Sequence, residues 1–347
     1  MVMRILLTGA TGVVGTEVVR RLRAVRREHE HTLTRVARRP GDDPALCWRI
    51  GSEAAPAELA GHWDVIVHAA ATTRWTLSRA EATNANVGPL RAVLALADRD
   101  THLVQVSTAY VGGLRNPQDL RGAEFEGYRN GYEWSKAVCE EIARAEHPGP
   151  LTVVRPPLIV GRRDSGEIGR FSGPYTLLQA LVSGLAAVVV GDPGGFAEIG
   201  PVDEVAALIV DAALAPPPAA VRTEVLAGGR GSLTLGGLLD VVCETLNECR
   251  AAHGVAPIER PPIVAGESWD RFFLPLADQY LSPFQSQAVK LLAMFQSYTS
   301  MSEPFEPTRT VEDPAAVMAA SVRYWAARKP RLALARPEPW TLLAKAA

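Results

Sequence analysis

The segment that decides the fold is residues 3–15, which read Met-Arg-Ile-Leu-Leu-Thr-Gly-Ala-Thr-Gly-Val-Val-Gly. Its apolar start, residues 4–7, predicts a buried β-strand, and residues 17–27 repeat apolar side chains at the spacing of one helix face. Glycines between the two could by themselves mark only a turn. A strand before the glycines and a helix after them are the context that a dinucleotide-binding turn requires.

Each glycine of this turn has a different expected task. Gly9 permits the tight turn, Gly12 lets the backbone approach a pyrophosphate, and Gly15 lets the helix pack closely on the strand. The N–H groups at the start of the helix then face the phosphates. We therefore expect a dinucleotide to contact this loop at Thr8, Gly9, Thr11, Gly12, Val13 and Gly15.

The chain beyond this turn alternates short apolar runs with helical stretches, which predicts helices wound around a parallel sheet. The expected strands are residues 4–7, 33–37, 65–68, 103–106 and 151–154. The predicted fold class is α/β, a doubly wound parallel Rossmann sheet with a smaller, mostly helical C-terminal substrate lobe. Such sheets bind ligands at the carboxyl ends of their strands.

The alternation stops about halfway along the chain, which indicates two domains. We predict a nucleotide-binding domain over residues 1–165 with a returning segment near 197–230, and a substrate-binding or lid lobe over 166–196 and 231–347. The last hundred residues hold five of the eight phenylalanines and three of the five methionines. This composition indicates a packed helical lobe, a homodimer interface or a lid over an apolar substrate.

The overall charge gives no support to nucleic-acid binding. The 347 residues include 36 Lys and Arg against 38 Asp and Glu, a net charge of −2, so no attraction to nucleic acid or to an anionic membrane is expected. The longest uncharged stretch, residues 171–191, is interrupted by Gly, Pro, Gln and Ser, so we expect no membrane span. Because the N-terminus runs into the glycine turn instead of a secretion signal, we expect a cytoplasmic protein.

Metal binding is not expected either. His29 and His31 lie in a charged stretch without a third ligand nearby, which we interpret as a solvated turn. His68 ends a strand and is interpreted as packing. No CxxC pair and no cluster with histidine is formed by the four cysteines, Cys47, Cys139, Cys243 and Cys249.

The residues after the second strand indicate which nicotinamide dinucleotide binds. An acidic residue about 20 positions past the glycines usually binds the ribose 2′-hydroxyl of NAD. Here the chain has Arg38 and Arg39, and no carboxylate follows the strand until Asp42. The planar guanidinium of Arg38, with Arg39 as second choice, matches a 2′-phosphate, so the sequence predicts NADP(H). Two solvated surface arginines are the alternative.

A second motif supplies groups for proton transfer. Ser107 and Thr108 directly follow an expected strand, and Tyr132 and Lys136 are four residues apart, on one face of a helix. A lysine ammonium there is expected to lower the pKa of the phenol, while a strand-end hydroxyl bonds the same substrate oxygen. With the upstream glycine turn, this order of motifs predicts a carbonyl-reducing site.

These motifs resemble those of the extended short-chain dehydrogenase/reductases over about residues 3–165. Within that family the chain is most similar to the fatty acyl-CoA reductase and thioester reductase branch, which has the male-sterility type of NAD-binding domain. The matching segments are TGATGVVG at 8–15, VIVHAAA at 65–71, Asn86-Val87-Gly88, VSTAYVGG at 106–113, YEWSK at 132–136 and VVRPPLIVG at 153–161.

The resemblance implies a catalytic hydroxyl, a proton donor, a lysine that binds ribose and tyrosine, and a family asparagine. We prefer Thr108 to Ser107 as the hydroxyl because it stands three residues before Val111, as the hydroxyl does in the related VYG pattern. The four implied catalytic residues are Thr108, Tyr132, Lys136 and Asn86.

The resemblance also implies further cofactor contacts. These fall to Ala69, Ala70, Pro156, Tyr132 and Lys136. The family commonly has Gly-Asp after the third strand to hold the adenine amino group, whereas this chain has Gly51-Ser52. The adenine contacts are therefore left open.

The implied activity is NADPH-dependent reduction of an acyl thioester, bound to coenzyme A or a carrier protein, to an aldehyde or alcohol. A ketone reductase or secondary alcohol dehydrogenase would use the same residues. A nucleotide-sugar epimerase or dehydratase is disfavoured by the apolar C-terminal lobe. A non-catalytic NADP(H)-sensing protein would have no need for Tyr132 and Lys136.

Overall fold

The computed structural model describes residues 2–26, 28–39, 45–112, 125, 127–275, 279, 281–282, 285–286, 289–290 and 295–338. Asp42 and Gly113, which belong to the sequence patterns above, lie outside the described residues. Two compact units make up the chain. The first consists of Met1–Pro157, Val202–Leu226 and Pro307–Arg309, and the second of Leu158–Pro201, Ala227–Glu306 and Thr310–Ala347.

The first unit is built on an eight-stranded sheet. Its strands are β1 (Met3–Thr8), β2 (His31–Ala37), β3 (Leu46–Cys47), β4 (Val65–His68), β5 (His102–Val106), β6 (Leu151–Arg155), β11 (Arg222–Ala227) and β14 (Arg309–Thr310). They lie in the order β14-β11-β6-β5-β4-β1-β2-β3, and the neighbours from β11 to β3 pair in parallel. The strand order reverses between β1 and β4, which is where such sheets bind their ligands.

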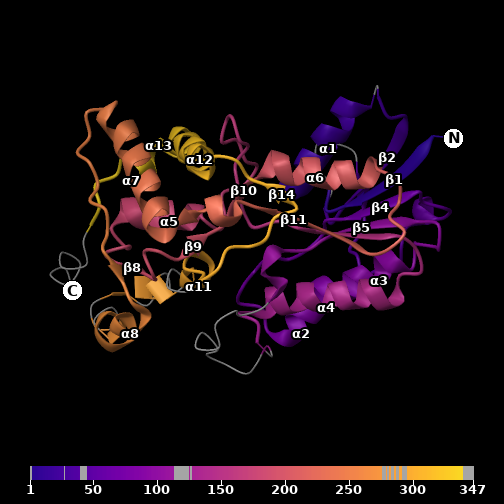
Figure 1. The fold of residues 1–347 in the computed structure, drawn as a ribbon, viewed down its shortest axis with the longest axis horizontal. Coiled ribbons are helices and arrows are strands. Elements are labelled where there is room, and N and C mark those ends of the chain that lie inside the picture. The colour runs from indigo at the N-terminus through magenta and orange to yellow at the C-terminus, as the bar shows by residue number, and fades with distance from the viewer. Residues whose placement is uncertain are drawn as a thin grey trace. The chain divides into compact units, whose positions relative to one another are not determined.

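Helices cover both faces of this sheet (Figure 1). On one face α1 (Val13–Val25) packs against α6 (Val202–Leu214), and on the other lie α2 (Arg79–Ala82), α3 (Gly88–Leu94) and α4 (Gly131–Glu146). The core beneath α3 and α4 is apolar and fully buried at Leu6, Ile66, Leu90, Leu103 and Val153. The predicted doubly wound sheet is confirmed.

The starts of two helices are set by the residues just before them, and α1 begins earlier than the expected residue 17. α1 starts at Val13, directly on the glycine turn, with Gly12 in an extended conformation at its N-cap. α4 starts at Gly131 because the Asn130 side chain accepts a hydrogen bond from Glu133 N at 3.1 Å and so caps the helix. Tyr132 therefore lies in the first turn of α4.

The second unit is mostly helical, as expected for the C-terminal lobe. Its helices include α5 (Tyr175–Ser183), α7 (Leu235–Ala251), α8 (Gly266–Ser268), α11 (Gln296–Thr299), α12 (Pro314–Arg328) and α13 (Pro330–Ala333). Its short strands pair as β7 (Leu158–Val160) with β10 (Ile199–Pro201), β8 (Val189–Val190) with β13 (Ile263–Val264), and β9 (Phe196–Ala197) with β12 (Leu233–Thr234).

The chain enters the second unit at Leu158, earlier than the expected boundary at residue 165, because β7 pairs with β10 and not with the central sheet. It returns to the first unit at Val202 and leaves again after Leu226. Within the described parts of the chain, each helix is too short or too polar to cross a membrane.

The buried carboxylate of Glu198 joins distant parts of the second unit. It accepts hydrogen bonds from Gly228 N at 2.8 Å, from Phe305 N at 3.0 Å and from the hydroxyl of Ser232. Burial raises the pKa of Glu198, and these hydrogen bonds oppose the rise. A single side chain therefore fixes three segments that are far apart in the sequence.

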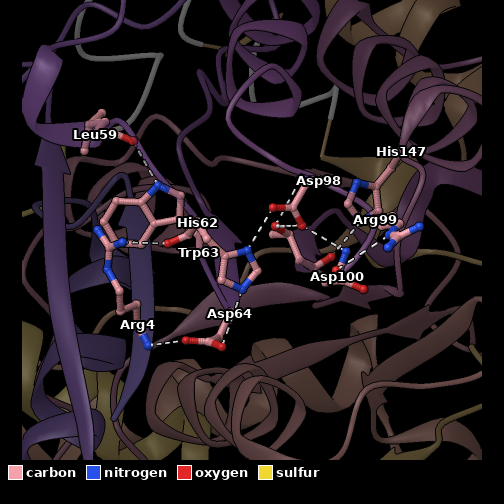
Figure 2. A network of polar contacts seen from close by, with 10 residues as sticks. Arg4, Leu59, His62, Trp63, Asp64, Asp98, Arg99, Asp100 and His147 are labelled. Carbon is pink, nitrogen blue, oxygen red and sulfur yellow. Dashed lines mark hydrogen bonds and ion pairs between the residues drawn. The ribbon is translucent and has the colours of Figure 1, made fainter. Parts of the chain in front are cut away.

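A polar network lies at the amino ends of β1, β4 and β5 (Figure 2). Asp64 accepts a hydrogen bond from Arg4 N at 2.7 Å, and the Arg4 guanidinium donates to His62 O at 2.8 Å. The His62 ring lies 2.8 Å from the Asp98 carboxylate and 3.6 Å from that of Asp64. Because ligands bind at the opposite ends of the strands, we assign this network to holding the strands together.

Candidate active site

The glycine turn between β1 and α1 is fixed by close backbone contacts. Gly9 has φ 71°, and a Cβ atom there would lie 2.7 Å from Ala70 N. A Cβ atom on Gly15 would lie 2.1 Å from Gly9 O, so only glycine fits while the turn keeps its shape. Gly12 is exposed, and the nearest described atom to a Cβ there is Gly9 O at 3.2 Å. The outer side of the turn, which also carries exposed Thr11 and partly exposed Val13, is therefore accessible to a ligand.

Thr8 and His68 end the neighbouring strands β1 and β4 and bond to each other, Oγ1 to Nδ1, at 2.8 Å. Thr8 is fully buried, and its hydroxyl also accepts a hydrogen bond from Ala70 N at 3.3 Å. Burial, and secondarily the charge of Lys136, lowers the pKa of His68 to about 3. The neutral ring therefore shapes the loop of Ala69 and Ala70 beside Gly9 and does not exchange protons near neutral pH.

Arg38 and Arg39 directly follow β2, at its carboxyl end, and both are exposed. Since β2 pairs with β1, the two arginines lie at the same edge of the sheet as the glycine turn. This is the position where the ribose of a dinucleotide is expected. Gly51, with φ 80°, packs against the chain at Pro89, where a Cβ atom would lie 2.8 Å from Pro89 N, and Ser52 is exposed.

Tyr132 and Thr108 are brought together by a hydrogen bond between their side chains. The Thr108 hydroxyl also donates to Pro156 O at 3.5 Å and accepts from Tyr110 N at 3.4 Å. Pro156 is thereby placed beside the predicted catalytic hydroxyl.

The expectation that Lys136 lowers the pKa of Tyr132 is wrong. The pKa of the phenol is raised well above its ordinary value, chiefly because its hydroxyl end is buried, and the Thr108 hydrogen bond offsets this only in part. The side chain as a whole is partly exposed. Tyr132 therefore stays protonated through the physiological range and can act as a proton donor.

Lys136 is buried, and its ammonium donates a hydrogen bond to Val106 O at 2.6 Å. Burial lowers the pKa of Lys136, while Cys139 and Glu140 act in the opposite direction. The bond to Val106 places the ammonium at the end of β5, directly before the two hydroxyl residues. Its charge is thus held at the strand end that carries Thr108.

The side chain of Asn86 makes hydrogen bonds to two other parts of the first unit. Its amide accepts a hydrogen bond from Thr72 N at 2.8 Å and donates to Thr72 O at 3.1 Å and to Ser135 Oγ at 2.8 Å. Asn86 therefore ties the loop after β4 to helix α4. The catalytic role that the resemblance implied for Asn86 stays a prediction.

Glu140 is a residue that the sequence interpretation missed. It is buried and accepts hydrogen bonds from Arg155 at 2.9 and 2.6 Å and from Arg144 at 3.0 Å. Burial alone would raise its pKa, but Arg155 and Arg144 lower it overall. The available signal was its place one helical turn after Lys136, where a carboxylate on a buried face needs a partner. Ser107, the second choice for the hydroxyl, is buried, and its hydroxyl has no hydrogen-bond partner among the described residues.

Two of the residues considered for metal binding or thiol chemistry are buried and make hydrogen bonds within the fold. His31 is buried in β2, with Nδ1 2.7 Å from His29 O, so only part of the expected solvated turn is exposed. Cys139 is buried, its thiol donates to Asn86 O at 3.5 Å, and burial raises its pKa. Over the described residues, no three His, Cys, Asp or Glu side chains are grouped so as to hold a metal.

The first unit fits a nicotinamide dinucleotide. The left-handed Gly9 brings the turn against Ala69 and Ala70, and the first turn of α1 offers N–H groups to a pyrophosphate. Beyond this cradle, Tyr132, Thr108 and Lys136 gather at the end of β5. The site can therefore hold a dinucleotide, donate a proton and stabilise a negative oxygen.

An apolar cavity lies entirely within the second unit. It has about 720 Å³ of space free of atoms, including the solvent at its mouth. Of the 17 described residues that line it, 15 are apolar and none is charged. They are Leu158, Pro174, Leu177, Leu185, Ala186, Val188, Val189, Val190, Ile199, Leu235, Leu238, Trp269, Val289, Phe295, Gln296, Thr299 and Met318.

Known proteins with a similar sequence segment or a similar fold were found. Residues 51–209 match the model of the Male sterility protein family of NAD-binding domains. The terminal R domain of the myxalamid PKS-NRPS biosynthetic pathway superposes with a TM-score of 0.68 at 18% identity, covering 94% of this chain and 91% of that one. The PhqB reductase domain from Penicillium fellutanum gives 0.65 at 16% identity, covering 94% of each chain. No curated protein matches by sequence.

Sugar-nucleotide enzymes share the fold as well. The Bordetella bronchiseptica enzyme WbmH in complex with NAD+ superposes with a TM-score of 0.60 at 18% identity, covering 93% of this chain and 98% of that one. UDP-sugar 4-epimerases are also among the similar structures. WbmH and another similar structure, MoeE5, contain a bound nicotinamide dinucleotide, and the family model describes an NAD-binding domain. Residues 51–209 of this chain therefore match a male-sterility NAD-binding model, and the chain as a whole has the fold of these reductase domains and epimerases.

Proposed function

We propose that this enzyme reduces an acyl thioester, carried by coenzyme A or by a carrier protein, with NADPH. The observation that carries the proposal is that Tyr132 and Lys136 share helix α4 and meet the end of β5, where Lys136 donates to Val106 O at 2.6 Å and the Thr108 hydroxyl bonds to the Tyr132 phenol. The likeness to terminal reductase domains supports a thioester as the group that is reduced.

Each group has a separate role in the proposed reaction. NADPH held by the glycine turn would be the source of the hydride that the carbonyl carbon accepts. Tyr132 donates its proton to the carbonyl oxygen, and Thr108 holds that oxygen with a hydrogen bond. The resulting hemithioacetal loses its thiol as the C–S bond breaks, so each turnover consumes one NADPH and one proton and yields aldehyde, thiol and NADP+. A second hydride transfer would give the alcohol.

The test is NADPH consumption by the whole protein with acyl-CoAs, acyl carrier-protein thioesters, ketones and UDP-sugars, each with product analysis. With thioesters we expect one thiol to be released for each NADPH oxidised in the first reduction step. In Tyr132→Phe we expect this thiol release to be lost. Ketone reduction without thiol release would contradict the thioester proposal and leave the ketone reductase. NADPH binding without turnover of any substrate would favour the sensing protein.

An epimerase is the second candidate because UDP-sugar 4-epimerases share the fold. Such an enzyme returns the hydride to its own substrate, so it interconverts two sugars without net consumption of dinucleotide. Chromatography of UDP-sugars incubated with the protein measures this activity. If the sugars interconvert and no thioester is reduced, the epimerase replaces the reductase as the proposed function.

The preference for NADPH rests on Arg38 and Arg39, which are exposed at the carboxyl end of β2. A 2′-phosphate would pair with one or both guanidinium groups. We expect Arg38→Asp to reverse the ratio of the NADPH and NADH dissociation constants, measured by fluorescence titration. Arg39→Asp should change the ratio less. An unchanged ratio in both variants would remove these arginines from the site.

The cytoplasmic location and the homodimer stay predictions. Neither affects the assignment of the site, since the predicted catalytic and dinucleotide-binding residues all belong to the first unit of one chain.

A further inference from the structure

Ser135 is a fully buried residue of α4 that lies between Tyr132 and Lys136. Its hydroxyl donates a hydrogen bond to Tyr132 O at 2.8 Å and accepts one from the Asn86 amide, Nδ2 to Oγ, at 2.8 Å. A serine inside a helix commonly donates to a carbonyl of the preceding turn, which leaves its oxygen free to accept. The Ser135 hydroxyl therefore makes one bond within the helix and one to a different part of the first unit.

The direction of these hydrogen bonds is fixed by the backbone of Thr72. Thr72 N donates to Asn86 Oδ1 at 2.8 Å, so the oxygen of the amide must face this N–H group. The Nδ2 group then faces Thr72 O at 3.1 Å and Ser135 Oγ. Because Nδ2 can only donate, Ser135 accepts from it and gives its own proton to Tyr132 O. The contacts form one directed chain from the loop after β4 to the carbonyl of Tyr132.

Asn86 lies in an irregular helical segment that packs on α4. This segment, Thr83–Val87, is π-helical and stands between α2 and α3. Such single π turns inside helices are frequent at functional sites. Asn86 is buried, and its backbone oxygen accepts a hydrogen bond at 3.5 Å from the thiol of Cys139, one turn after Ser135. The π-helical segment therefore contacts two successive turns of α4.

The first turn of α4 needs such contacts more than the rest of the helix. The N–H groups of a first turn have no partner inside the helix, and helix ends open most easily. Here the Asn130 side chain accepts a hydrogen bond from Glu133 N at 3.1 Å, and Ser135 holds the carbonyl of Tyr132. Tyr132 is the second residue of the helix, so its phenol keeps one position only while this turn stays closed.

The loop at the other end of this chain of contacts also forms one wall of the dinucleotide cradle. Ala70 N donates to Thr8 Oγ1 at 3.3 Å, and a Cβ atom on Gly9 would lie 2.7 Å from Ala70 N. Thr72, two residues further along, holds the Asn86 amide. The hydrogen bonds therefore link the loop at the cradle to the helix turn that carries the predicted proton donor.

We propose that Ser135 is a positioning residue that fixes the first turn of α4, and with it the Tyr132 phenol, relative to the loop beside the glycine turn. Ser135 is fully buried, so its effect on the reaction passes through Tyr132. Loss of the hydroxyl should let the phenol leave the place from which it donates a proton, while the glycine turn keeps its shape. The effect on catalysis rests on the proposed function, whereas the effect on the helix turn does not.

The first test compares Ser135→Thr with Ser135→Val in the whole protein. The two side chains have the same shape, but only threonine keeps a hydroxyl that can bond to the preceding turn. We expect Ser135→Val to lower kcat by about 10- to 100-fold, the effect of a small misplacement of a reacting group. The KM values of the thioester and of NADPH should stay close to wild type. Ser135→Thr should keep most of the wild-type kcat, and equal kcat values in the two variants would overturn the proposal.

Ser183→Ala is the matched control. The Ser183 hydroxyl also donates to a carbonyl of its own helix, Ala180 O of α5, at 3.2 Å, but this helix belongs to the second unit. Its loss should leave kcat and KM unchanged. Melting temperatures are measured for all variants. A lower melting temperature of Ser135→Val with wild-type kcat would show a purely structural role and overturn the proposal.

A double-mutant cycle tests the chain of contacts with side chains that add no bulk, and it replaces the first test if the valine or threonine variant does not fold. Ser135→Ala removes the hydroxyl, and Asn86→Ala removes the amide that bonds to it. If the two residues act in one chain, Ser135→Ala should lower kcat in the wild type and much less in the Asn86→Ala background. Independent effects, or no effect of Ser135→Ala, would overturn the proposal.

Hydrogen exchange separates this inference from the proposed function. The amides in the first two turns of α4 should exchange faster in Ser135→Val, or in Ser135→Ala, than in the wild type, whether or not a thioester is reduced. If exchange is faster but no thioester is reduced by the wild type, the proposed function fails and the fixing of the helix turn by Ser135 stands. If thioesters are reduced but exchange is unchanged, the proposed function stands and the positioning role is overturned.

Discussion

Burial shifts the pKa values of two residues near the glycine turn and the end of β5 in opposite directions. It raises the pKa of the Tyr132 phenol and lowers that of the His68 imidazole to about 3, so both are neutral near pH 7. The Tyr132 side chain is partly exposed, although its hydroxyl end is buried, whereas His68 is buried against Thr8. The neutral phenol keeps the proton that a donor needs, and the neutral buried imidazole is suited to holding a loop.

Replacing Tyr132 with Phe removes the phenol oxygen and leaves the ring. We expect turnover to fall by about 10²- to 10⁴-fold, the range attributed to a general acid, while NADPH affinity and the melting temperature stay close to wild type. Steady-state kinetics and fluorescence titration measure the two effects. Wild-type turnover in the variant would exclude the proton-donor role.

Thr108 and Ser107 can be separated in the same assay. Thr108→Ala removes the hydroxyl that bonds to Tyr132, so turnover should fall, but less than in Tyr132→Phe because one of two donors remains. The Ser107 hydroxyl has no hydrogen-bond partner among the described residues, so Ser107→Ala should cost less still. The reverse order of the two alanine variants would make Ser107 the catalytic hydroxyl.

At the scale of elements, α4 and the end of β5 form the chemical part of the site, and the turn into α1 forms the cradle for the dinucleotide. The two ends of the sheet serve different purposes. The glycine turn and Thr108 lie at the carboxyl ends of the strands, and the His62 network lies at the amino ends (Figure 2). Variants at the two ends should therefore affect different properties.

Two glycines of the turn should respond differently to alanine. Gly15→Ala places a Cβ atom 2.1 Å from Gly9 O and should destabilise the fold by about 1–3 kcal/mol, as overpacking does. Gly12→Ala meets only Gly9 O at 3.2 Å and, as an N-cap change, should cost less than about 1 kcal/mol, yet it fills the space of the pyrophosphate. Thermal unfolding and NADPH titration separate the effects. Equal loss of stability in both variants would contradict the assignment.

The pair of His62 and Asp98 predicts a pH-dependent contribution to stability. The hydrogen bond to Asp98 raises the pKa of His62 above its ordinary 6.5, and the same bond lowers the pKa of Asp98 to about 2. The His62 contribution is complete below pH 6.5 and is lost as pH rises through its folded-state pKa. The Asp98 contribution is present above its ordinary 3.8 and is lost as pH falls through about 2.

The difference in melting temperature between wild type and His62→Gln should therefore be largest near pH 5 and should shrink above the folded-state pKa of His62. A pH series of thermal unfolding curves measures it, and an NMR titration of the His62 ring gives the pKa directly. Asp98→Asn is the matched variant and should show the same closing gap. A gap that stays constant from pH 5 to 9 would show that the contact contributes through packing alone.

At the scale of the whole molecule, the chain has two compact units. The predicted catalytic and dinucleotide-binding residues belong to the first unit and the apolar cavity to the second. NADPH should therefore stabilise the first unit, by about 2.7 kcal/mol at a hundredfold excess over its dissociation constant. Hydrogen exchange should show stronger protection by NADPH around the glycine turn than around α5 and α7. Equal protection of these peptides by NADPH would contradict this division.

The sequence by itself determined the order of the motifs, and with it the Rossmann fold. Gly9 and Gly15 are dictated by local geometry, since a left-handed φ and a backbone contact of 2.1 Å exclude other side chains. The spacing of Tyr132 and Lys136 on one helix is likewise local. Such features can be predicted because neighbours in the sequence decide them.

Only the tertiary structure decided the environment of those residues. The raised pKa of Tyr132 and the hydrogen bonds of Asn86 depend on strands and loops far away in the sequence. Glu140 meets Arg155, and the walls of the cavity meet each other, only after β5, β6 and the later helices have packed. Burial and contacts between distant segments set these energies, and neither can be read from the order of residues alone.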